Sequence, residues 1–552
     1  MTTAIYFHPE AYSIQGPKLM GRNAAGESFL RGYFTYSQQK TLWTQVMQAD
    51  HAQAFADSAI HYGRNEPIKA VTNEQMAALK EVNVVYYPGP NIDNLAWQRS
   101  HLGHDAWSLC GITHTTSSTV AMNAISQLIT APIQPWDAII CTSIAVKNNV
   151  NQILQAQADY LSDRLKINQL VLPQLPVIPL GIHTKDFEFT PQQKKDARTK
   201  ISADNNTHVV LYMGRLSFHA KAHPLAMYQA LEDAAQQLPE NEQIILIECG
   251  WFANDAIQQA YREAQTLACP SIRVITLDGR EADNRQTAWA SADVFCSLSD
   301  NIQETFGITP IEAMATGIPV IVSDWNGYKD SVADGEEGYR IPTLMPTAGL
   351  GKDLAYRHAL GLDNYDRYCG QCCSLISVDI KATAEAFTRL FESATLRIQL
   401  GKNGQKKARE LFDWSTIIPR YEELWEELNS LRSKHHPTQP SPSHSWPTHL
   451  DPFHSFASYP TQLLNATTQL ILVDDNTETA LQRLKQYQEL EMVNFSLSIL
   501  PTENEIKQMF RSGSPHGSQA IGWVKDIAQE RQAICLRGLG WLVKLGILMV
   551  AK

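Results

Sequence analysis

Short β-rich runs of apolar residues alternate along most of the chain with longer segments that have a helical pattern. The first series of runs comprises residues 5–7, 82–88, 108–114 and 138–142. The second series comprises residues 209–213, 244–248, 273–277, 293–298 and 319–323. Strands that alternate with helices predict parallel sheets of βα units with helices on both faces. We therefore expect an α/β protein with two doubly wound, Rossmann-like domains.

The two series meet near residues 176–190, where the sequence Pro-Val-Ile-Pro-Leu-Gly favours an extended connection. We place the first domain at residues 1–190 and the second at residues 191–412.

The composition changes at residues 433–460, which hold six prolines and five histidines and have no helical or strand period. Such a tract is typical of a flexible linker. The histidines leave a metal site open as an alternative, although cysteines and a regular ligand spacing are missing from the tract.

A separate C-terminal module is expected at residues 461–552, either α/β or mainly helical. It contains a predicted strand (residues 470–473), a helix (residues 477–490) and a helical region that ends in the apolar residues 534–550. The apolar end fits a core helix as well as an interface. The module's role is therefore open, with regulation or binding of a protein partner as the candidates.

The composition narrows the possible partners. The chain has 552 residues, with 44% hydrophobic and 19% charged residues, and a formal net charge of -11. An acidic balance argues against general binding of nucleic acid, but it permits a local cationic pocket. Nine cysteines are too few for a disulfide scaffold, and the N-terminus has no signal-peptide pattern. We expect a soluble cytoplasmic protein, with peripheral contact to a membrane as a further possibility.

The most informative stretch runs from Asp300 to Val322. A strand, a loop, a short helix and a second strand follow one another, with Pro310 expected at the first helical position and Gly317 at the helix end. The helix start would lie at the carboxyl edge of a parallel sheet, where backbone N–H groups favour an anion. Glu304 and Glu312 bracket this position. Glu312 could instead complete a capping box, and Glu304 could be a solvated surface carboxylate.

Two cations follow the first strand of the second domain, Arg215 and Lys221. Either alone would usually be a surface charge. A guanidinium and an ammonium group beside a helix start can hold a diphosphate. Their position at the same predicted sheet edge as Glu304 and Glu312 favours a phosphate site.

Together, these residues resemble the retaining family 4 glycosyltransferases of the GT-B fold, also described as glycosyl transferases group 1. The resemblance rests on Gly214-Arg215, Lys221, Glu304-x7-Glu312, Phe306-Gly307 and the stretch that ends in Gly317-x-Pro319-Val, and it covers about residues 1–430. It implies that Arg215 and Lys221 hold the diphosphate of a nucleotide-sugar donor. It further implies that Glu304 faces the donor sugar, that Glu312 bonds the ribose, and that the segment Thr305, Phe306, Gly307 and Ile308 completes the pocket.

The resemblance extends into the first domain. Residues 413–431 resemble the family's closing helix, which packs back on that domain. His114 follows a predicted strand and, by the resemblance, would contact the donor sugar beside its anomeric carbon. A lone histidine at such a place is otherwise usually structural. The segment 21–30 resembles the family's glycine-rich loop, with Gly26 as the candidate donor contact and Gly21 as a weaker one. Most relatives have two adjacent glycines, whereas this chain has Ala25-Gly26.

The expected activity is transfer of a sugar from a nucleotide diphosphate to an acceptor hydroxyl group, with retention of configuration. The cationic groups would stabilise the departing diphosphate. We expect no cofactor and no catalytic metal, since no Asp-x-Asp pair follows a strand of the α/β region, and Asp474-Asp475 fits a turn in the C-terminal module. A non-catalytic nucleotide-sugar-binding scaffold is the main alternative; a dehydrogenase is disfavoured because no Gly-x-Gly-x-x-Gly follows the opening strands.

The acceptor is not defined by these motifs and could be a saccharide, a lipid-linked molecule or a protein. Its recognition is expected on first-domain loops such as residues 89–103, which carry Trp97, Arg99 and His101, with His104 just beyond. Buried packing is an equal alternative for these side chains. The cluster Cys369, Cys372 and Cys373 resembles half of a metal site.

Overall fold

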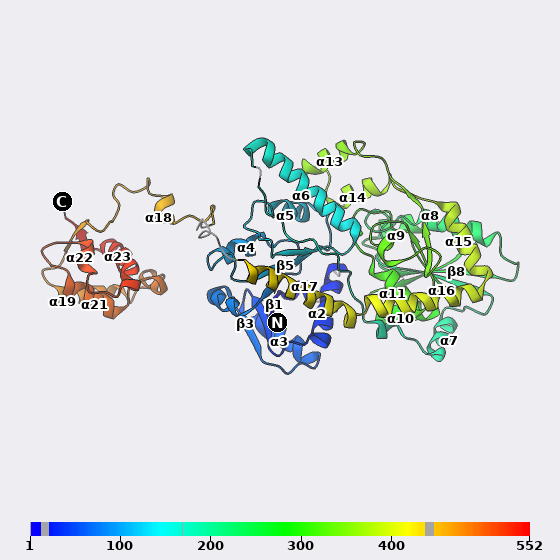
Figure 1. Ribbon diagram of the computed structural model, residues 1–552, viewed down its shortest axis with the longest axis horizontal. Helices are drawn as coiled ribbons and strands as arrows, with labels where there is room; N and C mark the ends of the chain where they lie inside the picture. Colours follow the sequence, from blue (N-terminus) through cyan, green and yellow to red (C-terminus); the bar gives the residue numbers. More distant parts are fainter. Residues whose placement is uncertain (1, 13–20, 168, 436–445, 552) are drawn as a thin grey trace. The chain divides into compact units, whose positions relative to one another are not determined.

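The computed structural model describes residues 2–12, 21–167, 169–435 and 446–551 (Figure 1). The chain forms two compact units, residues 1–446 and residues 447–552. Each unit is considered separately below.

The first part of the larger unit is a six-stranded parallel sheet with the order β3-β2-β1-β4-β5-β6. Its strands are β1 (Thr3–Phe7), β2 (Leu42–Val46), β3 (Ile68–Val71), β4 (Val84–Tyr86), β5 (Ser108–Ile112) and β6 (Ala138–Ile140). The helices between and after them are α1 (Pro9–Tyr12), α2 (Gly21–Tyr36), α3 (Ala49–His61), a 3₁₀ helix (Asn73–Glu81), α4 (Asp93–Ser100), α5 (Thr119–Gln127) and α6 (Ile144–Leu165).

The second part is another six-stranded parallel sheet, with the order β12-β11-β10-β7-β8-β9. Its strands are β7 (Thr207–Met213), β8 (Gln243–Gly250), β9 (Arg273–Asp278), β10 (Val294–Ser297), β11 (Val320–Ser323) and β12 (Gly338–Ile341). Its helices are α7 (Pro191–Lys200), α8 (Leu225–Ala235), α9 (Asp255–Ala268), α10 (Ala282–Ser291), α11 (Ile308–Thr316), α12 (Tyr328–Ser331), α15 (Ile380–Glu392) and α16 (Ala394–Lys407). The central strands are buried along their whole length because helices cover both faces.

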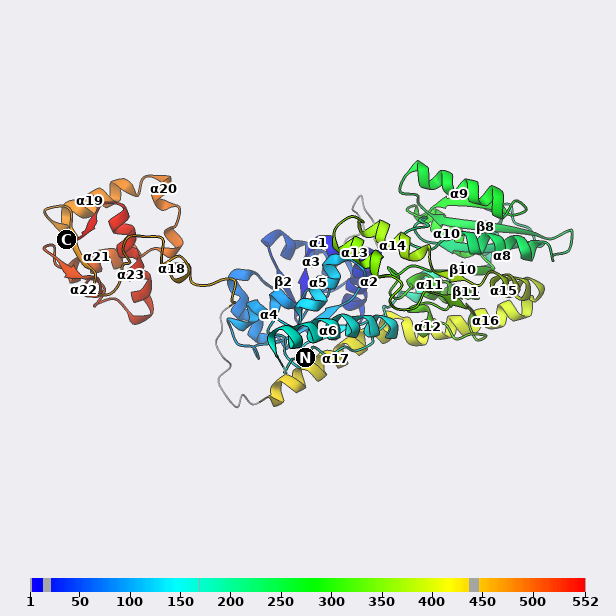
Figure 2. The ribbon, with the colours of Figure 1, turned by 90° about the horizontal axis from the view of Figure 1, so that it is seen from above.

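A helical hairpin that the sequence did not predict is inserted between β12 and α15. It consists of α13 (Lys352–Ala359) and α14 (Tyr365–Cys373), and the short antiparallel strands β13 (Thr343–Leu344) and β14 (Ser377–Val378) close its base. Figures 1 and 2 both show α13 and α14 beside the region where the two sheets meet.

The chain then crosses back to the first sheet through a short π-helical turn (Ala408–Phe412) and α17 (Trp414–Lys434). Trp414, at the start of α17, is completely buried and donates its indole N–H to the Ser28 hydroxyl at 2.8 Å. Its ring fills the space left by two glycines, since a Cβ added at Gly32 or Gly181 would lie 2.6 Å or 2.5 Å from it. The two glycines are therefore what allows α17 to approach so closely.

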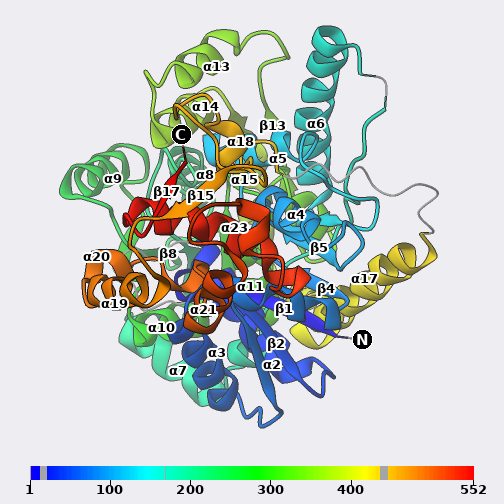
Figure 3. The same cartoon turned by 90° about the vertical axis from the view of Figure 1, so that its left-hand side faces the viewer.

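The smaller unit has a three-stranded antiparallel sheet with the order β16-β15-β17, visible in Figure 3. Its elements are α18 (Pro452–Ser455), β15 (Gln469–Leu472), α19 (Thr477–Tyr487), α20 (Glu491–Asn494), a 3₁₀ turn (Leu497–Ile499), α21 (Glu503–Ser512), β16 (Ser518–Gln519), α22 (Ala520–Trp523), α23 (Gln529–Lys544) and β17 (Leu548–Val550).

Two expectations for this region need correction. The apolar C-terminal end is not helical throughout: it leaves α23 after Lys544 and forms β17, which pairs with β15. Residues 433–460 are not without regular structure either, since Pro452–Ser455 form a helical turn capped by Asp451. Residues 436–445, with two of the histidines, lie outside the described residues. No helix among the described residues is both long and apolar enough to cross a membrane.

The close approach at Trp414 predicts that Gly181→Ala destabilises the larger unit. The new methyl group would overlap the buried indole ring, and overpacking of this kind costs about 1–3 kcal/mol. Gly351→Ala is the matched control, because a Cβ there would meet no atom within 4 Å. Thermal unfolding of both variants tests this; equal melting temperatures would contradict the packing described.

Candidate functional site

The loop between β10 and α11 carries most of the predicted donor residues. α11 begins at Ile308 and its N-cap is Gly307, which has a left-handed conformation (φ 87°) and sits against the ring of Tyr328. Only glycine fits this position, because a Cβ would lie 1.9 Å from that ring. Gly317 ends the helix with φ 82°, as expected.

The expected start of this helix is wrong by two residues. Pro310 is the third helical residue and not the first, and Thr309 is not the N-cap. The capping-box alternative for Glu312 therefore fails, because this carboxylate lies in the second turn. The helix start has no side-chain cap, so its backbone N–H groups can serve an anion.

Glu304 lies in this loop as a nearly buried carboxylate, which overturns the surface alternative. It pairs with the Lys221 ammonium group at 2.9 Å and accepts backbone bonds from Thr305 at 3.2 Å and Phe306 at 3.4 Å. Burial alone would raise the pKa of Glu304, but the charge and hydrogen bond of Lys221 and the two amides hold it below its ordinary value. The carboxylate is thus ionised and fixed in place.

Arg215 and Lys221 lie on the loop between β7 and α8, at the same edge of the sheet. The Arg215 guanidinium contacts the Ala220 carbonyl at 3.2 Å, which curls the loop. The Asn301 amide donates to the His219 carbonyl at 3.0 Å and the His223 amide donates to the Asp300 carboxylate at 3.2 Å. These bonds join the cation-bearing loop to the Glu304 loop.

The first domain meets the Glu304 loop directly. The Thr305 hydroxyl donates to the backbone carbonyl of His114 at 3.1 Å, and Ser143 donates to the Thr305 carbonyl at 2.8 Å. The Ile144 backbone N–H donates to the Asp330 carboxylate at 2.7 Å and adds a third link between the domains. The structure thus brings Lys221, Glu304, Thr305 and the backbone of His114 to the contact between the two α/β domains, which is the candidate cleft.

Glu312 and Asp300 are two further carboxylates on this side of the cleft. Burial raises the pKa of Glu312 to about 7, opposed by the charge of Arg285. Burial likewise raises the pKa of Asp300 to about 7, opposed by hydrogen bonds from the Cys373 thiol and the His223 amide. Both groups are therefore largely uncharged below neutral pH, which reduces their repulsion of an anion. Asp300 and Cys373 were not expected at the site, and no sequence pattern connects them.

Other first-domain candidates have different roles. Gly26 lies inside α2 and not in a loop, and a Cβ there would meet the Ala11 carbonyl at 2.1 Å. Arg99 is buried in α4 and forms a two-point salt bridge with Asp137 at 2.6 and 2.7 Å, so it is not an acceptor contact. Trp97 stacks on Trp446 with ring centres 6.2 Å apart.

The cysteine cluster lies on α14, where Cys369 and Cys373 are buried. Within the part of the chain that the structure describes, no group of three or more His, Cys, Asp or Glu side chains is arranged to hold a metal ion.

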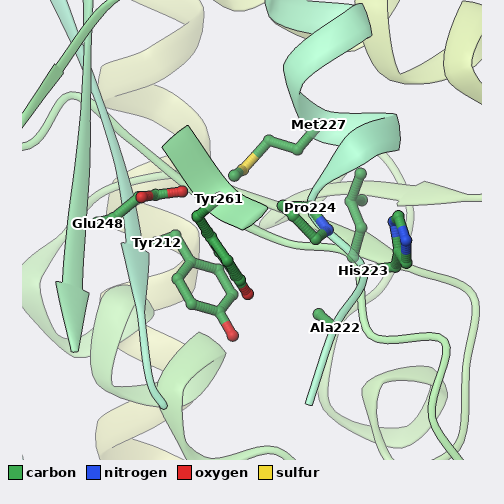
Figure 4. Close-up of a pocket in the computed structure, with 8 residues that line it drawn as sticks. Tyr212, Ala222, His223, Pro224, Met227, Glu248 and Tyr261 are labelled. Carbon is green, nitrogen blue, oxygen red and sulfur yellow. The ribbon is translucent and has the colours of Figure 1, made fainter. Parts of the chain in front are cut away.

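A small pocket lies behind the cation-bearing loop, lined by Tyr212, Ala222, His223, Pro224, Met227, Glu248, Tyr261 and Leu298 (Figure 4). Its volume of about 10 Å³ is enough for about one water molecule. Glu248, at the end of β8, accepts hydrogen bonds from Tyr228 and, at 2.9 Å, from Gln265. Burial raises the pKa of Glu248 to about 7. The pocket is too small for a sugar or a nucleotide. The side chains that line it pack behind the cation-bearing loop.

Comparison with known proteins identifies the class of the second domain. Residues 193–348 match the family model "Glycosyl transferases group 1". The Bacillus subtilis spore coat protein SA is 24% identical over 235 residues, which are 42% of this chain and 52% of that protein. A D-inositol 3-phosphate glycosyltransferase of Corynebacterium efficiens is 23% identical over 42% of this chain and 46% of its own length. The matches thus span about half the length of these curated relatives.

Solved structures with the same fold cover both α/β domains. Anabaena HepE in complex with UDP has a TM-score of 0.50 at 15% identity, and covers 77% of this chain and 100% of its own. A glycosyltransferase from Rickettsia africae has a TM-score of 0.50 at 12% identity, with 77% and 98% covered. The chain therefore has the GT-B fold, and the predicted fold class is confirmed. The family match is confined to residues 193–348 of its second domain.

The buried Glu248 predicts a defined pH dependence of stability. Its folded pKa lies above that of an unfolded glutamate, so the folded state binds the extra proton and stability falls as the pH rises from about 4.5 to about 7. Glu248→Gln removes the titrating carboxyl group. The stability of this variant relative to the wild type should therefore rise by about 1 kcal/mol per pH unit across that window. Denaturant unfolding at pH 5, 6, 7 and 8 measures the difference. The exposed Glu240→Gln is the control, and parallel curves for wild type and Glu248→Gln would refute the assignment.

Proposed function

We propose that the protein is a retaining glycosyltransferase that moves a sugar from a nucleoside diphosphate to the hydroxyl group of an acceptor. The observation that carries this proposal is the pairing of Lys221 with Glu304. Thr305, which follows Glu304 on the same loop, bonds the backbone carbonyl of His114 in the opposite domain. One cleft then holds Lys221 as a cation for phosphate, Glu304 as a fixed carboxylate for sugar hydroxyls, and the His114 segment. The group 1 family match and the GT-B fold support the same activity.

In this proposal Arg215, Lys221 and the uncapped start of α11 bind the diphosphate. The backbone of Phe306, Gly307 and Ile308 belongs to that helix start. Lys221 is one-third exposed and already placed by its bond to Glu304, so it can turn from the carboxylate toward an incoming phosphate. Glu304 then binds hydroxyl groups of the donor sugar and Glu312 binds the ribose.

The transfer step follows from these positions. The bond from the anomeric carbon to the β-phosphate oxygen breaks, and a bond from the acceptor oxygen to that carbon forms on the same face. The acceptor proton passes to the departing phosphate, whose negative charge the two cations and the helix start stabilise. His114 lies on the opposite side of the cleft, where it faces the donor sugar. Closure of the cleft limits attack by water.

Ligand-induced stabilisation tests the donor site. In a thermal-shift panel of UDP-, GDP-, ADP- and dTDP-sugars, we expect one donor to stabilise the wild type, by about 2.7 kcal/mol at a hundred times its Kd. Lys221→Ala should lose most of this shift because it removes a phosphate contact. Lys402→Ala, an exposed lysine of α16, should keep it. Absence of a shift with every donor, or an equal shift in Lys221→Ala, rejects the diphosphate site.

The alternative of a non-catalytic scaffold is separated by product formation. The donor selected by the panel should release nucleoside diphosphate, slowly with water and faster with a suitable acceptor. Because positive charge at the leaving group comes from Arg215, Lys221 and the helix start, the rate should be unchanged in EDTA. Binding without release would support the scaffold, and a rate abolished by EDTA and restored by Mg²⁺ or Mn²⁺ would contradict metal independence.

A further inference from the structure

The hairpin at residues 343–376 belongs by sequence to the donor-side domain but reaches the first domain. The hydroxyl group of Tyr365, the first residue of α14, lies 3.4 Å from both the Thr115 and the Ser117 hydroxyls. Nearby, the His358 ring nitrogen lies 3.3 Å from the Thr119 hydroxyl. All of these first-domain residues follow His114 directly in sequence.

The opposite side of α14 is fixed to the donor-side loops. The Cys373 thiol lies 3.0 Å from the Asp300 carboxylate and 3.6 Å from the Phe218 carbonyl. Gly370 packs so tightly that an added Cβ would lie 2.8 Å from Cβ of His219. α14 therefore spans from the loop that carries Arg215 and Lys221 to the segment that carries His114.

The turn that presents Tyr365 is itself held firmly. The Asp363 side chain is fully buried and pairs with Arg357 at 2.7 Å and with Arg367 at 3.1 Å. The Asn364 side chain caps α14 by accepting from the Arg367 amide at 2.9 Å. These contacts fix the start of the helix, so the Tyr365 hydroxyl is presented from a rigid base.

The segment that receives Tyr365 is short and held at both ends. The Thr113 amide bonds the Ile140 carbonyl at 3.0 Å, and the Ser118 hydroxyl caps α5 by accepting from Ala121 at 3.2 Å. Between these anchors, Thr305 bonds the His114 carbonyl and Tyr365 contacts the hydroxyls of Thr115 and Ser117. The donor-side domain thus contacts this segment from two separate elements.

We propose that Tyr365 is a positioning residue for glycosyl transfer, which acts through Thr115 and Ser117 to hold the His114 segment against the Glu304 loop. This inference rests on the proposed function and goes beyond the residues that the family resemblance implies. The hairpin couples the diphosphate-side loops to the opposite wall of the cleft. In this role Tyr365 does not contact the donor. It fixes the position of the His114 segment, which faces the donor sugar.

The test compares Tyr365→Phe, which removes only the hydroxyl group, with Tyr356→Phe. Tyr356 lies on α13 of the same hairpin and is 65% exposed. The first measurement is amide hydrogen exchange of residues 113–119 in the full chain without nucleotide. We expect exchange there to rise severalfold in Tyr365→Phe and to stay at the wild-type level in Tyr356→Phe.

The second measurement is steady-state kinetics with the donor that the thermal-shift panel selects and water as the acceptor. Loss of one positioning hydrogen bond should lower kcat by about two- to tenfold, while KM for the donor stays within about twofold. In a Thr115→Val, Ser117→Ala background, Tyr365→Phe should have no further effect on kcat, because its partners are already missing.

Several results would overturn the proposal. Unchanged exchange at residues 113–119 would show that Tyr365 does not hold the segment. A raised donor KM with unchanged kcat would make Tyr365 a donor-binding residue, and increased exchange throughout the larger unit would make it a stability residue only. If no nucleotide sugar binds the wild type, the proposed function fails and the transfer role fails with it. Normal donor binding with no change in kcat rejects Tyr365 alone.

Discussion

The cleft depends on how the chain crosses between the two α/β domains. It crosses near residues 176–190 and again near residues 408–414, and the two crossings are bonded to each other. The Ile182 amide donates to the Phe412 carbonyl at 2.8 Å, and the Trp414 amide donates to the Ile182 carbonyl at 3.1 Å. The Thr184 hydroxyl adds a bond of 2.6 Å to the Asp413 carboxylate. With Trp414 buried between Gly32 and Gly181, this joint sets where the carboxyl edges of the two sheets face each other.

The local charges at the cleft are compatible with the proposed diphosphate site, although the chain as a whole is acidic. Lys221 is neutralised by Glu304 in the structure, so the site has little net charge before a ligand arrives. Asp300 is buried and Glu312 is partly buried; desolvation raises the pKa of each to about 7, so they contribute only partial negative charge near neutral pH. The overall charge of -11 has limited effect at the site because salt screens exposed charges over about 8–10 Å.

Most of the fold could be predicted because buried parallel strands are continuous apolar runs. Residues such as Val209 to Met213 have no other stable environment than the middle of a covered sheet. The common edge of the Arg215 loop and the Glu304 loop followed from the same pattern, since parallel strands end at the same side. These features depend on local sequence and on a general rule of sheet geometry.

The failures have a common cause, which is tertiary contact that overrides a local signal. Thr309-x-x-Glu312 reads as a capping box, but Gly307 takes the N-cap because the Tyr328 ring leaves no room for a side chain there. Arg99 is a candidate for acceptor recognition with buried packing as an equal alternative, and its salt bridge with Asp137, 38 residues later, decides for burial. α13 has no buried residue, so it is not one of the core-facing helices that the apolar pattern predicts.

The contacts on the two sides of the cleft differ in kind. The joint at Ile182 and Trp414 consists of backbone bonds and a buried indole, which cannot be replaced by water without exposing a large apolar ring. The hydrogen bonds across the cleft from Ser143, Ile144 and Thr305 each involve a side chain. The contacts of Tyr365 with Thr115 and Ser117 join side-chain hydroxyl groups 3.4 Å apart. Hydroxyl groups exchange such partners for water at little cost. The crossings are therefore the more firmly bonded side of the contact between the two domains.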